Sequence, residues 1–173
     1  MLDTKKFTTL RPFIMKSSKL WVAAGAVVVG LVVTAIVWKR PDRGAELCTS
    51  VARRDLKNTR ELLTRHPGLV NVSRPQPGNH HWTPLHIAAY GANKPMVELL
   101  LSHRANINAK DNLGATPLHL STFVGNKELA EYLVVRGADV NAKGNDGRTA
   151  LDLAKLSQNG PLIEVLRRHK AKE

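Results

Sequence analysis

The sequence repeats one short phrase at a fixed interval. The stretch WTPLHIAAY begins at Trp82, ATPLHLSTF begins at Ala115, and a fainter copy, RTALDLAKL, begins at Arg148. From each copy to the next, the threonine recurs after 33 residues. A fixed period of this length is typical of repeat proteins, in which no unit buries its apolar face alone and stability requires stacking.

Each copy predicts two helices. Pro84 and Pro117 follow a threonine and open a short helix, where the missing N–H of proline is no loss. Asparagine is a preferred N-cap residue, and Asn93, Asn126 and Asn159 each precede a second, apolar-periodic stretch. The apolar face of that longer helix is Met96, Val97, Leu100 and Leu101 in one unit and Leu129, Ala130, Leu133 and Val134 in the next.

The loops carry their own signals. Gly137 in RGADVN is placed to end its helix in the left-handed conformation, and Arg104 takes the matching place in HRANIN. If the backbone is the same, a side chain there costs about 1 kcal/mol. The stretches DNLG and GNDG are typical of β-turns. We therefore expect residues 41–173 to fold alone as a soluble, wholly helical-and-turn domain.

From Ala45 onward the chain resembles the ankyrin-repeat family. The resemblance is carried by TPLH at 83–86 and 116–119 and by RGADVNAKGNDGRTALDLA from Arg136. It implies an all-α ankyrin-repeat solenoid of helix-turn-helix units with β-turn fingertips. The repeat domain is expected at 45–171 as four units, 44–80, 81–113, 114–146 and 147–171.

The terminal units differ from this pattern. The first has Cys48 where the second has His86, and the last has Ala150 and Asp152 in place of proline and histidine. The loop at 73–82 is also longer than its counterparts by about four residues. Unequal insertions of this kind often lie on the binding face of a solenoid.

The amino-terminal quarter predicts a membrane helix. Residues 20–38 carry no charge, and Trp21 and Trp38 lie at the two ends of this stretch. As a helix it would reach about 28 Å, close to the thickness of a bilayer core. We expect a basic tail at 1–19, a transmembrane signal anchor at 20–38 and a juxtamembrane linker at 39–44. The alternative is a signal peptide cleaved after Val33-Thr34-Ala35.

The flanking charges indicate an orientation and two membrane-related interactions. A short basic tail is costly to translocate, so the repeat domain is expected on the extracytoplasmic side, periplasmic or lumenal. Anionic lipid headgroups are the expected neighbours of Lys39, Arg40 and Arg43. A homodimer could form where small residues recur every four positions in the span, at Ala26, Gly30 and Thr34.

The composition bears on other functions. The chain has 26 Lys and Arg against 14 Asp and Glu, for a net charge of +12, but only 5% aromatic residues. Because the repeats alternate basic with acidic residues and lack a stacking stripe, no nucleic-acid binding is expected. A hydrolase or redox enzyme using Cys48 is a weaker alternative, as is a metal at His80 and His81. No catalysis, metal or cofactor is expected.

The resemblance implies binding of a protein partner, because ankyrin domains in general recognise partners through their turn tips and the inward surface of their short helices. The function expected is that of a membrane-anchored adaptor or scaffold. The alternative is a homo-oligomeric membrane scaffold assembled through the span. The positions implied for partner binding are Asn79, His80, Trp82, Tyr90, Asn112, Leu113, Ala115, Phe123, Val124, Asn145, Asp146, Arg148 and Leu156.

Overall fold

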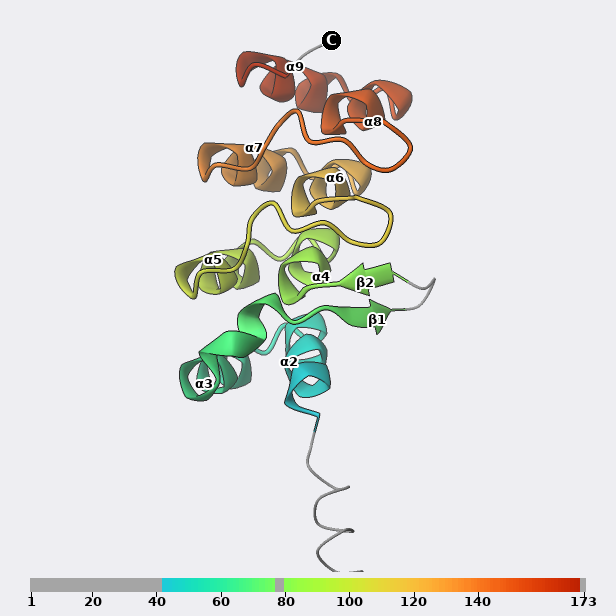
Figure 1. Ribbon diagram of the computed structural model, residues 1–173. Coiled ribbons are helices and arrows are strands. Elements are labelled where there is room, and N and C mark those ends of the chain that lie inside the picture. Colours follow the sequence, from blue (N-terminus) through green and yellow to red (C-terminus); the bar gives the residue numbers. More distant parts are fainter. Residues whose placement is uncertain (1–41, 77–79, 172–173) are drawn as a thin grey trace, which may run out of the picture. The chain divides into compact units, whose positions relative to one another are not determined.

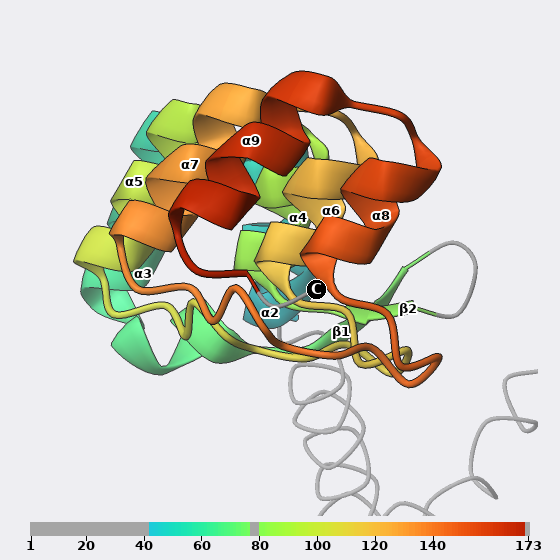
Figure 2. The same cartoon turned by 90° about the horizontal axis from the view of Figure 1, so that it is seen from above.

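A stack of four helix pairs forms the repeat domain in the computed structural model, which describes residues 42–76 and 80–171 (Figure 1). The inner helices are α2 (Arg43–Ala52), α4 (Pro84–Tyr90), α6 (Pro117–Phe123) and α8 (Ala150–Leu156). The outer helices are α3 (Leu56–Arg65), α5 (Lys94–Ser102), α7 (Lys127–Val135) and α9 (Gly160–Arg168). A 3-10 helix, η1 (Pro67–Asn71), follows α3. Figure 2, which looks along the stack, shows the inner and outer helices as two layers.

The helix starts follow the predicted signals. Pro84 and Pro117 open α4 and α6, each after a threonine N-cap. The side chains of the predicted asparagine N-caps each accept a hydrogen bond from a backbone N–H of the first helical turn: Asn93 from Met96, Asn126 from Leu129 and Asn159 from Leu162. These bonds satisfy N–H groups that the helix itself leaves without a partner.

The first helix begins earlier than the predicted linker allows. Residues 39–44 were expected to connect the span to the repeats, but α2 begins at Arg43. The cause is Asp42, whose carboxylate accepts from the backbone N–H groups of Gly44 and Ala45, both at 3.1 Å. Aspartate is among the best N-cap residues, so the repeat domain starts at Asp42.

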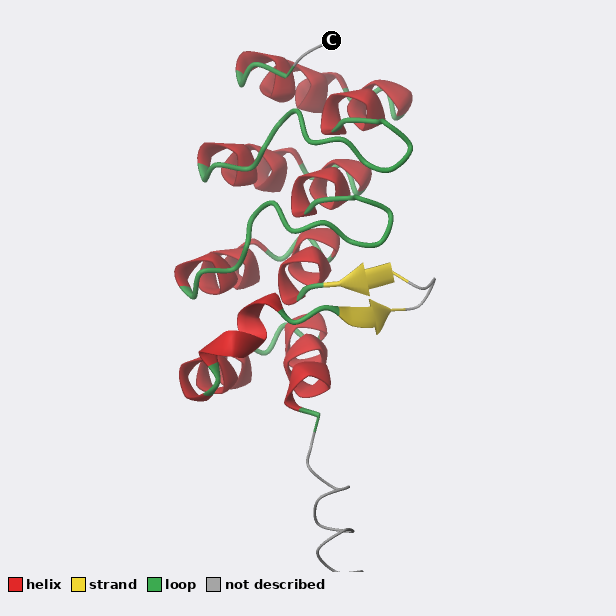
Figure 3. Ribbon diagram, viewed as in Figure 1, coloured by secondary structure: helices red, strands yellow, loops and turns green. Residues whose placement is uncertain are grey.

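The prediction of a wholly helical-and-turn domain is wrong at the long loop. Strands β1 (Arg74–Gln76) and β2 (His80–Trp82) pair as an antiparallel hairpin (Figure 3). Pro75 pairs with His81 in the middle of the ladder. Proline has no N–H to donate, so it is tolerated in an edge strand such as this one. The extra residues of this loop therefore extend a turn into a projecting hairpin.

The core lies between the two layers and runs through all four units. Consecutive inner helices pack on each other, α2 on α4, α4 on α6 and α6 on α8. The largest side chains that are almost wholly buried are leucines, joined by one methionine and one histidine. They are Leu47, Leu63, Leu85, His86, Met96, Leu100, Leu118, Leu129, Leu133, Leu151, Leu162 and Leu166.

Asparagines join consecutive loops along the side of the stack. The side-chain oxygen of Asn71 accepts from the backbone N–H of Asn106 at 2.7 Å, and the side-chain oxygen of Asn108 accepts from that of Asp139 at 2.8 Å. Asn71 therefore connects the first unit to the second. Arg104 has a φ of 65° and Gly137 a φ of 98°, so the backbone is preserved where arginine replaces glycine.

The predicted span at 20–38 lies outside the described residues. Within 42–76 and 80–171, no helix has both the length and the apolar character needed to cross a membrane.

Candidate protein-binding groove

Three large apolar side chains occupy one equivalent place in successive units. Tyr90, Phe123 and Leu156 are the last residues of the inner helices α4, α6 and α8. Their exposed fractions are 47%, 67% and 64%. Apolar side chains this exposed do not contribute to the core, so they are available to another molecule.

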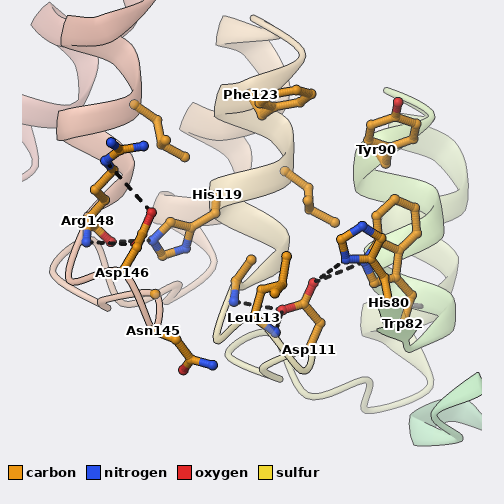
Figure 4. A pocket seen from close by; sticks show the side chains of 14 residues that line it. His80, Trp82, Tyr90, Asp111, Leu113, His119, Phe123, Asn145, Asp146 and Arg148 are labelled. Atoms are coloured by element: carbon orange, nitrogen blue, oxygen red, sulfur yellow. Dashed lines mark hydrogen bonds and ion pairs between the residues drawn. The ribbon is translucent and has the colours of Figure 1, made fainter. Parts of the chain in front are cut away.

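A groove of about 880 Å³ lies beside this row, between the inner helices and the fingertips (Figure 4). The fingertips are the β1–β2 hairpin and the turns 111–114 and 144–147. We call this space the concave groove. It brings together nine of the positions predicted for partner binding: His80, Trp82, Tyr90, Leu113, Ala115, Phe123, Asn145, Asp146 and Arg148.

An aromatic wall lines one end of the concave groove. His80 stacks on Trp82 with ring centroids 5.5 Å apart, and Trp82 packs against Tyr90 at 5.0 Å. The hairpin supplies the first two rings and α4 supplies the third. The wall exists because β2 points His80 and Trp82 to the same side, as alternate residues of a strand do.

Asp111 fixes this wall to the next fingertip. Its carboxylate accepts from the backbone N–H groups of Leu113 at 2.9 Å and Ala115 at 2.8 Å. The same carboxylate accepts from Trp82 Nε1 at 3.1 Å and lies 3.9 Å from His80 Nδ1. Only 1% of its side chain is exposed. A buried carboxylate needs such partners, so Asp111 connects the hairpin to the turn that carries Leu113.

The two turns beyond the hairpin stack closely. The backbone N–H of Asn145 donates to the Leu113 carbonyl at 2.8 Å, and Asn145 Nδ2 donates to the Asn112 carbonyl at 3.0 Å. Gly114 permits this approach, because a Cβ there would lie 2.5 Å from Asn145 Oδ1. Gly114 also has a φ of 73°, which disfavours other residues.

An ion pair lies at the opposite end of the concave groove from the aromatic wall. Arg148 Nε is 3.7 Å from Asp146 Oδ2, and both side chains are more than half exposed. Exposed pairs of this kind contribute little stability. Asp146 and Arg148 are therefore able to exchange partners when another molecule binds.

The remaining predicted positions are placed differently. Val124, which follows α6, and Leu156, which ends α8, are exposed at 38% and 64% but do not line the groove. Asn112 does not line it either; its side-chain oxygen accepts from the backbone N–H of His81 at 3.2 Å. Asn79 lies outside the described residues. Five further residues line the groove that were not predicted from the sequence: Asp111, His119, Leu120, Gly144 and Leu153.

The histidines of the two TPLH sequences, His86 and His119, form hydrogen bonds that join consecutive units below the groove. His86 Nδ1 bonds the Thr83 hydroxyl at 2.8 Å, and its Nε2 donates to the Ala115 carbonyl at 3.0 Å. His119 repeats this pattern with Thr116 at 2.9 Å and the Arg148 carbonyl at 3.2 Å. Each histidine therefore joins its own helix start to the next unit.

Acidic pH should lower the stability of the fold through these two histidines. Burial lowers the pKa of both His86 and His119 below the ordinary value, because the charged ring loses its hydration. The unfolded chain takes up these protons near pH 6.5, whereas the folded chain resists them. We expect the free energy of unfolding to be largest above about pH 6.5 and to fall as the pH is lowered to about 5. Urea unfolding across this range measures it, and a flat profile would contradict the buried, neutral assignment.

In the last unit Asp152 takes the place of the histidine, and we do not expect its hydrogen bonds to depend on pH in the same range. Its carboxylate accepts from the backbone N–H of Thr149 at 2.9 Å and from the Thr149 hydroxyl at 2.8 Å. These hydrogen bonds lower the pKa of Asp152. The carboxylate therefore stays ionised through the pH range in which the histidines titrate.

Cys48 lacks the features of a reactive thiol. It is 5% exposed, and burial raises its pKa from 9.0 to about 11. A pKa raised by two units lowers the thiolate fraction at neutral pH about a hundredfold. We expect a chromogenic disulfide reagent to label the folded protein at pH 8 only slowly, and rapidly once denaturant is added. Fast labelling without denaturant would revive a redox or nucleophilic role.

The histidine pair in the hairpin does not form a metal site with other residues. His80 faces the groove and stacks on Trp82, whereas its neighbour His81 is exposed on the other face of β2. Among the residues that the structure describes, no three His, Cys, Asp or Glu side chains are grouped so that they could hold a metal ion.

Comparison with known families agrees with the fold. A family model described as Ankyrin repeats (3 copies) matches residues 47–144 and 110–172. No curated protein matches the chain. The matched ranges cover most of the sequence and coincide with the stacked helix pairs. The chain therefore belongs to the ankyrin-repeat family.

Proposed function

We propose that this chain is a membrane-anchored adaptor that binds another protein in its concave groove and performs no catalysis. Ankyrin repeats imply protein–protein interaction and are typically non-catalytic. The main observation in support of partner binding is the position of the exposed apolar side chains. Seven large hydrophobic side chains are exposed in the described part of the chain. Five of them lie at the ends of the inner helices or on a fingertip: Tyr90, Leu113, Phe123, Val124 and Leu156.

The character of the groove supports a protein as the ligand. Aromatic and large apolar residues at the centre of an interface supply most of its binding energy. The concave groove has such residues on two sides, with Trp82 and Tyr90 at one end and Leu113 and Phe123 beyond them. Two exposed charged groups of the groove, Asp146 and Arg148, lie at the far end, where they can orient a partner.

The membrane part of the proposal is supported by sequence alone. The uncharged stretch at 20–38, the tryptophans at its ends and the flanking basic residues favour an uncleaved signal anchor. The repeat domain is then extracytoplasmic, and Lys39, Arg40 and Arg43 neighbour anionic headgroups. Amino-terminal sequencing of the mature protein tests the anchor: an intact segment 20–38 supports it, and a chain beginning at Ile36 establishes cleavage.

Affinity capture with the full chain tests the binding function. The matched pair of variants is Leu113→Ala, which removes an exposed side chain of the groove, and Val135→Ala, which removes one from the outer helix α7. We expect a protein that is retained by the unchanged chain and by Val135→Ala but lost with Leu113→Ala. Identical captures by all three chains would show that the groove is not the binding face.

Crosslinking of the full chain tests the alternative function. Dimers that disappear when Ala26, Gly30 and Thr34 are replaced by leucine, in a chain that captures no other protein, would favour a homo-oligomeric scaffold over an adaptor.

A further inference from the structure

The row of exposed apolar side chains has a spacing that selects among possible ligands. Tyr90, Phe123 and Leu156 end three inner helices that pack directly on one another. Packed helices have axes about 8–10 Å apart, so one side chain is presented at roughly this interval. A ligand that contacts all three side chains must present apolar residues of its own at a similar interval along one of its faces.

An α-helix meets this requirement and a β-strand does not. Seven residues of α-helix rise about 10.5 Å and return to the same face within about 20°. In a strand, residues on one face recur about every 6.6 Å, which misses the second position of the row. A polyproline helix repeats every 9.3 Å or so, but presents a single narrow edge.

The concave groove is too broad for a single edge. A second row, Leu120 and Leu153, lies three positions earlier on α6 and α8 and is partly buried. Leu113 lines the same groove from a fingertip (Figure 4). An amphipathic helix has an apolar stripe at least 100° wide, with residues at i, i+3, i+4 and i+7. That width can contact both rows and the fingertip together.

In the first unit, the face that carries the apolar row in the later units is basic instead of apolar. The residue that ends α2 is Ala52, which is small, and Arg53 follows it. A second hollow of about 520 Å³ is lined by Ala52, Arg53 and Arg74. The Arg53 guanidinium has no hydrogen bond or ion pair with any residue the structure describes, and Arg74 pairs with Asp42 while its Nε remains buried without a partner. Two guanidinium groups against one carboxylate favour an acidic ligand here.

We propose that the occupant of the concave groove is an amphipathic α-helix of the partner protein, with apolar residues every seven positions and an acidic end beside the first repeat. The apolar residues contact Tyr90, Phe123 and Leu156 in turn. About seven residues from the first of them, a glutamate or aspartate reaches Arg53. This inference rests on the proposed function and specifies the chemistry of the partner.

Synthetic peptides test the inference directly. The probe is a labelled peptide of about 28 residues with leucines in a heptad stripe and three glutamates at one end. One control has the same composition with the spacing scrambled, a second has lysines for the glutamates, and a third is proline-rich with leucine at every third position. Binding to the full chain in mild detergent is followed by fluorescence anisotropy against a protein-free detergent blank.

The heptad probe should bind more tightly than all three controls. Phe123→Ala should weaken its affinity about thirtyfold, while Val135→Ala, which removes an equally exposed apolar side chain from α7, should leave it unchanged. Arg53→Glu should weaken the acidic probe and strengthen the lysine control. Arg60→Glu, on the exposed side of α3, is the matched charge control.

Three outcomes overturn the inference: the scrambled peptide binding as well as the heptad probe, the proline-rich peptide binding best, or Phe123→Ala having no effect. The first two leave the proposed function standing if Leu113→Ala still abolishes capture of a natural partner. If that capture is also unaffected, the proposed function fails as well.

Discussion

Replacing Leu100 by alanine should cost about 2–5 kcal/mol of the free energy of unfolding. Leu100 lies on α5, has an exposed fraction of 0% and belongs to the continuous core that joins the four units. Its removal leaves a cavity that the surrounding leucines cannot fill. A stacked repeat protein depends on contacts between neighbouring units, so the loss affects the stability of the whole stack.

Urea unfolding followed by circular dichroism measures this effect. Val135→Ala, whose side chain is 66% exposed, is the control and should change the unfolding midpoint little. A loss below about 1 kcal/mol for Leu100→Ala would contradict the packing described for α5.

Phe123→Ala should have the opposite effect, a loss of partner binding with little change in melting temperature. Truncating a central interface residue costs about 2 kcal/mol or more of binding energy, which is about thirtyfold in affinity. The side chain is 67% exposed on α6, so the folded chain loses few contacts when it is removed. Calorimetry of the partner complex and thermal melting of the free variant separate the two roles.

A residue that ends an inner helix, such as Phe123 or Tyr90, can serve in partner binding or in packing between units. Tyr90 is 47% exposed and also packs against Trp82, with ring centroids 5.0 Å apart, so it combines exposed surface with a packing contact. Phe123 has no comparable neighbour in the described aromatic contacts and is more exposed. A large drop in melting temperature for Phe123→Ala, with affinity retained, would return it to a packing role.

Local signals predicted most of the fold. The asparagine caps, the Thr-Pro helix starts and the two turns act within a few residues, so the chain needs no distant partner to specify them. The left-handed backbone at Arg104 was predictable because the repeat supplies Gly137 as a template. The exposure of Leu113, at 52%, followed from its place in a turn.

The parts that were missed depend on contacts between distant residues. Trp82 and Asp111 are 29 positions apart in the sequence, and only the stacked fold shows that the Trp82 indole N–H donates a hydrogen bond to the Asp111 carboxylate. Asp111 had one local signal, its place at the head of the DNLG turn, but this indicated a turn and gave no link to the hairpin. Leu120 and Leu153 resemble ordinary core residues in the sequence, and their contribution to the groove depends on the packing angle of the inner helices.

The most direct test is the affinity of the captured partner for the full chain and for Leu113→Ala, measured alongside the melting temperature of each. Leu113 is half-exposed at a fingertip and lines the concave groove. We expect Leu113→Ala to bind the partner about thirtyfold more weakly, with an unchanged melting temperature. Equal affinities for the two chains would show that the partner binds elsewhere and that the concave groove is not the functional site.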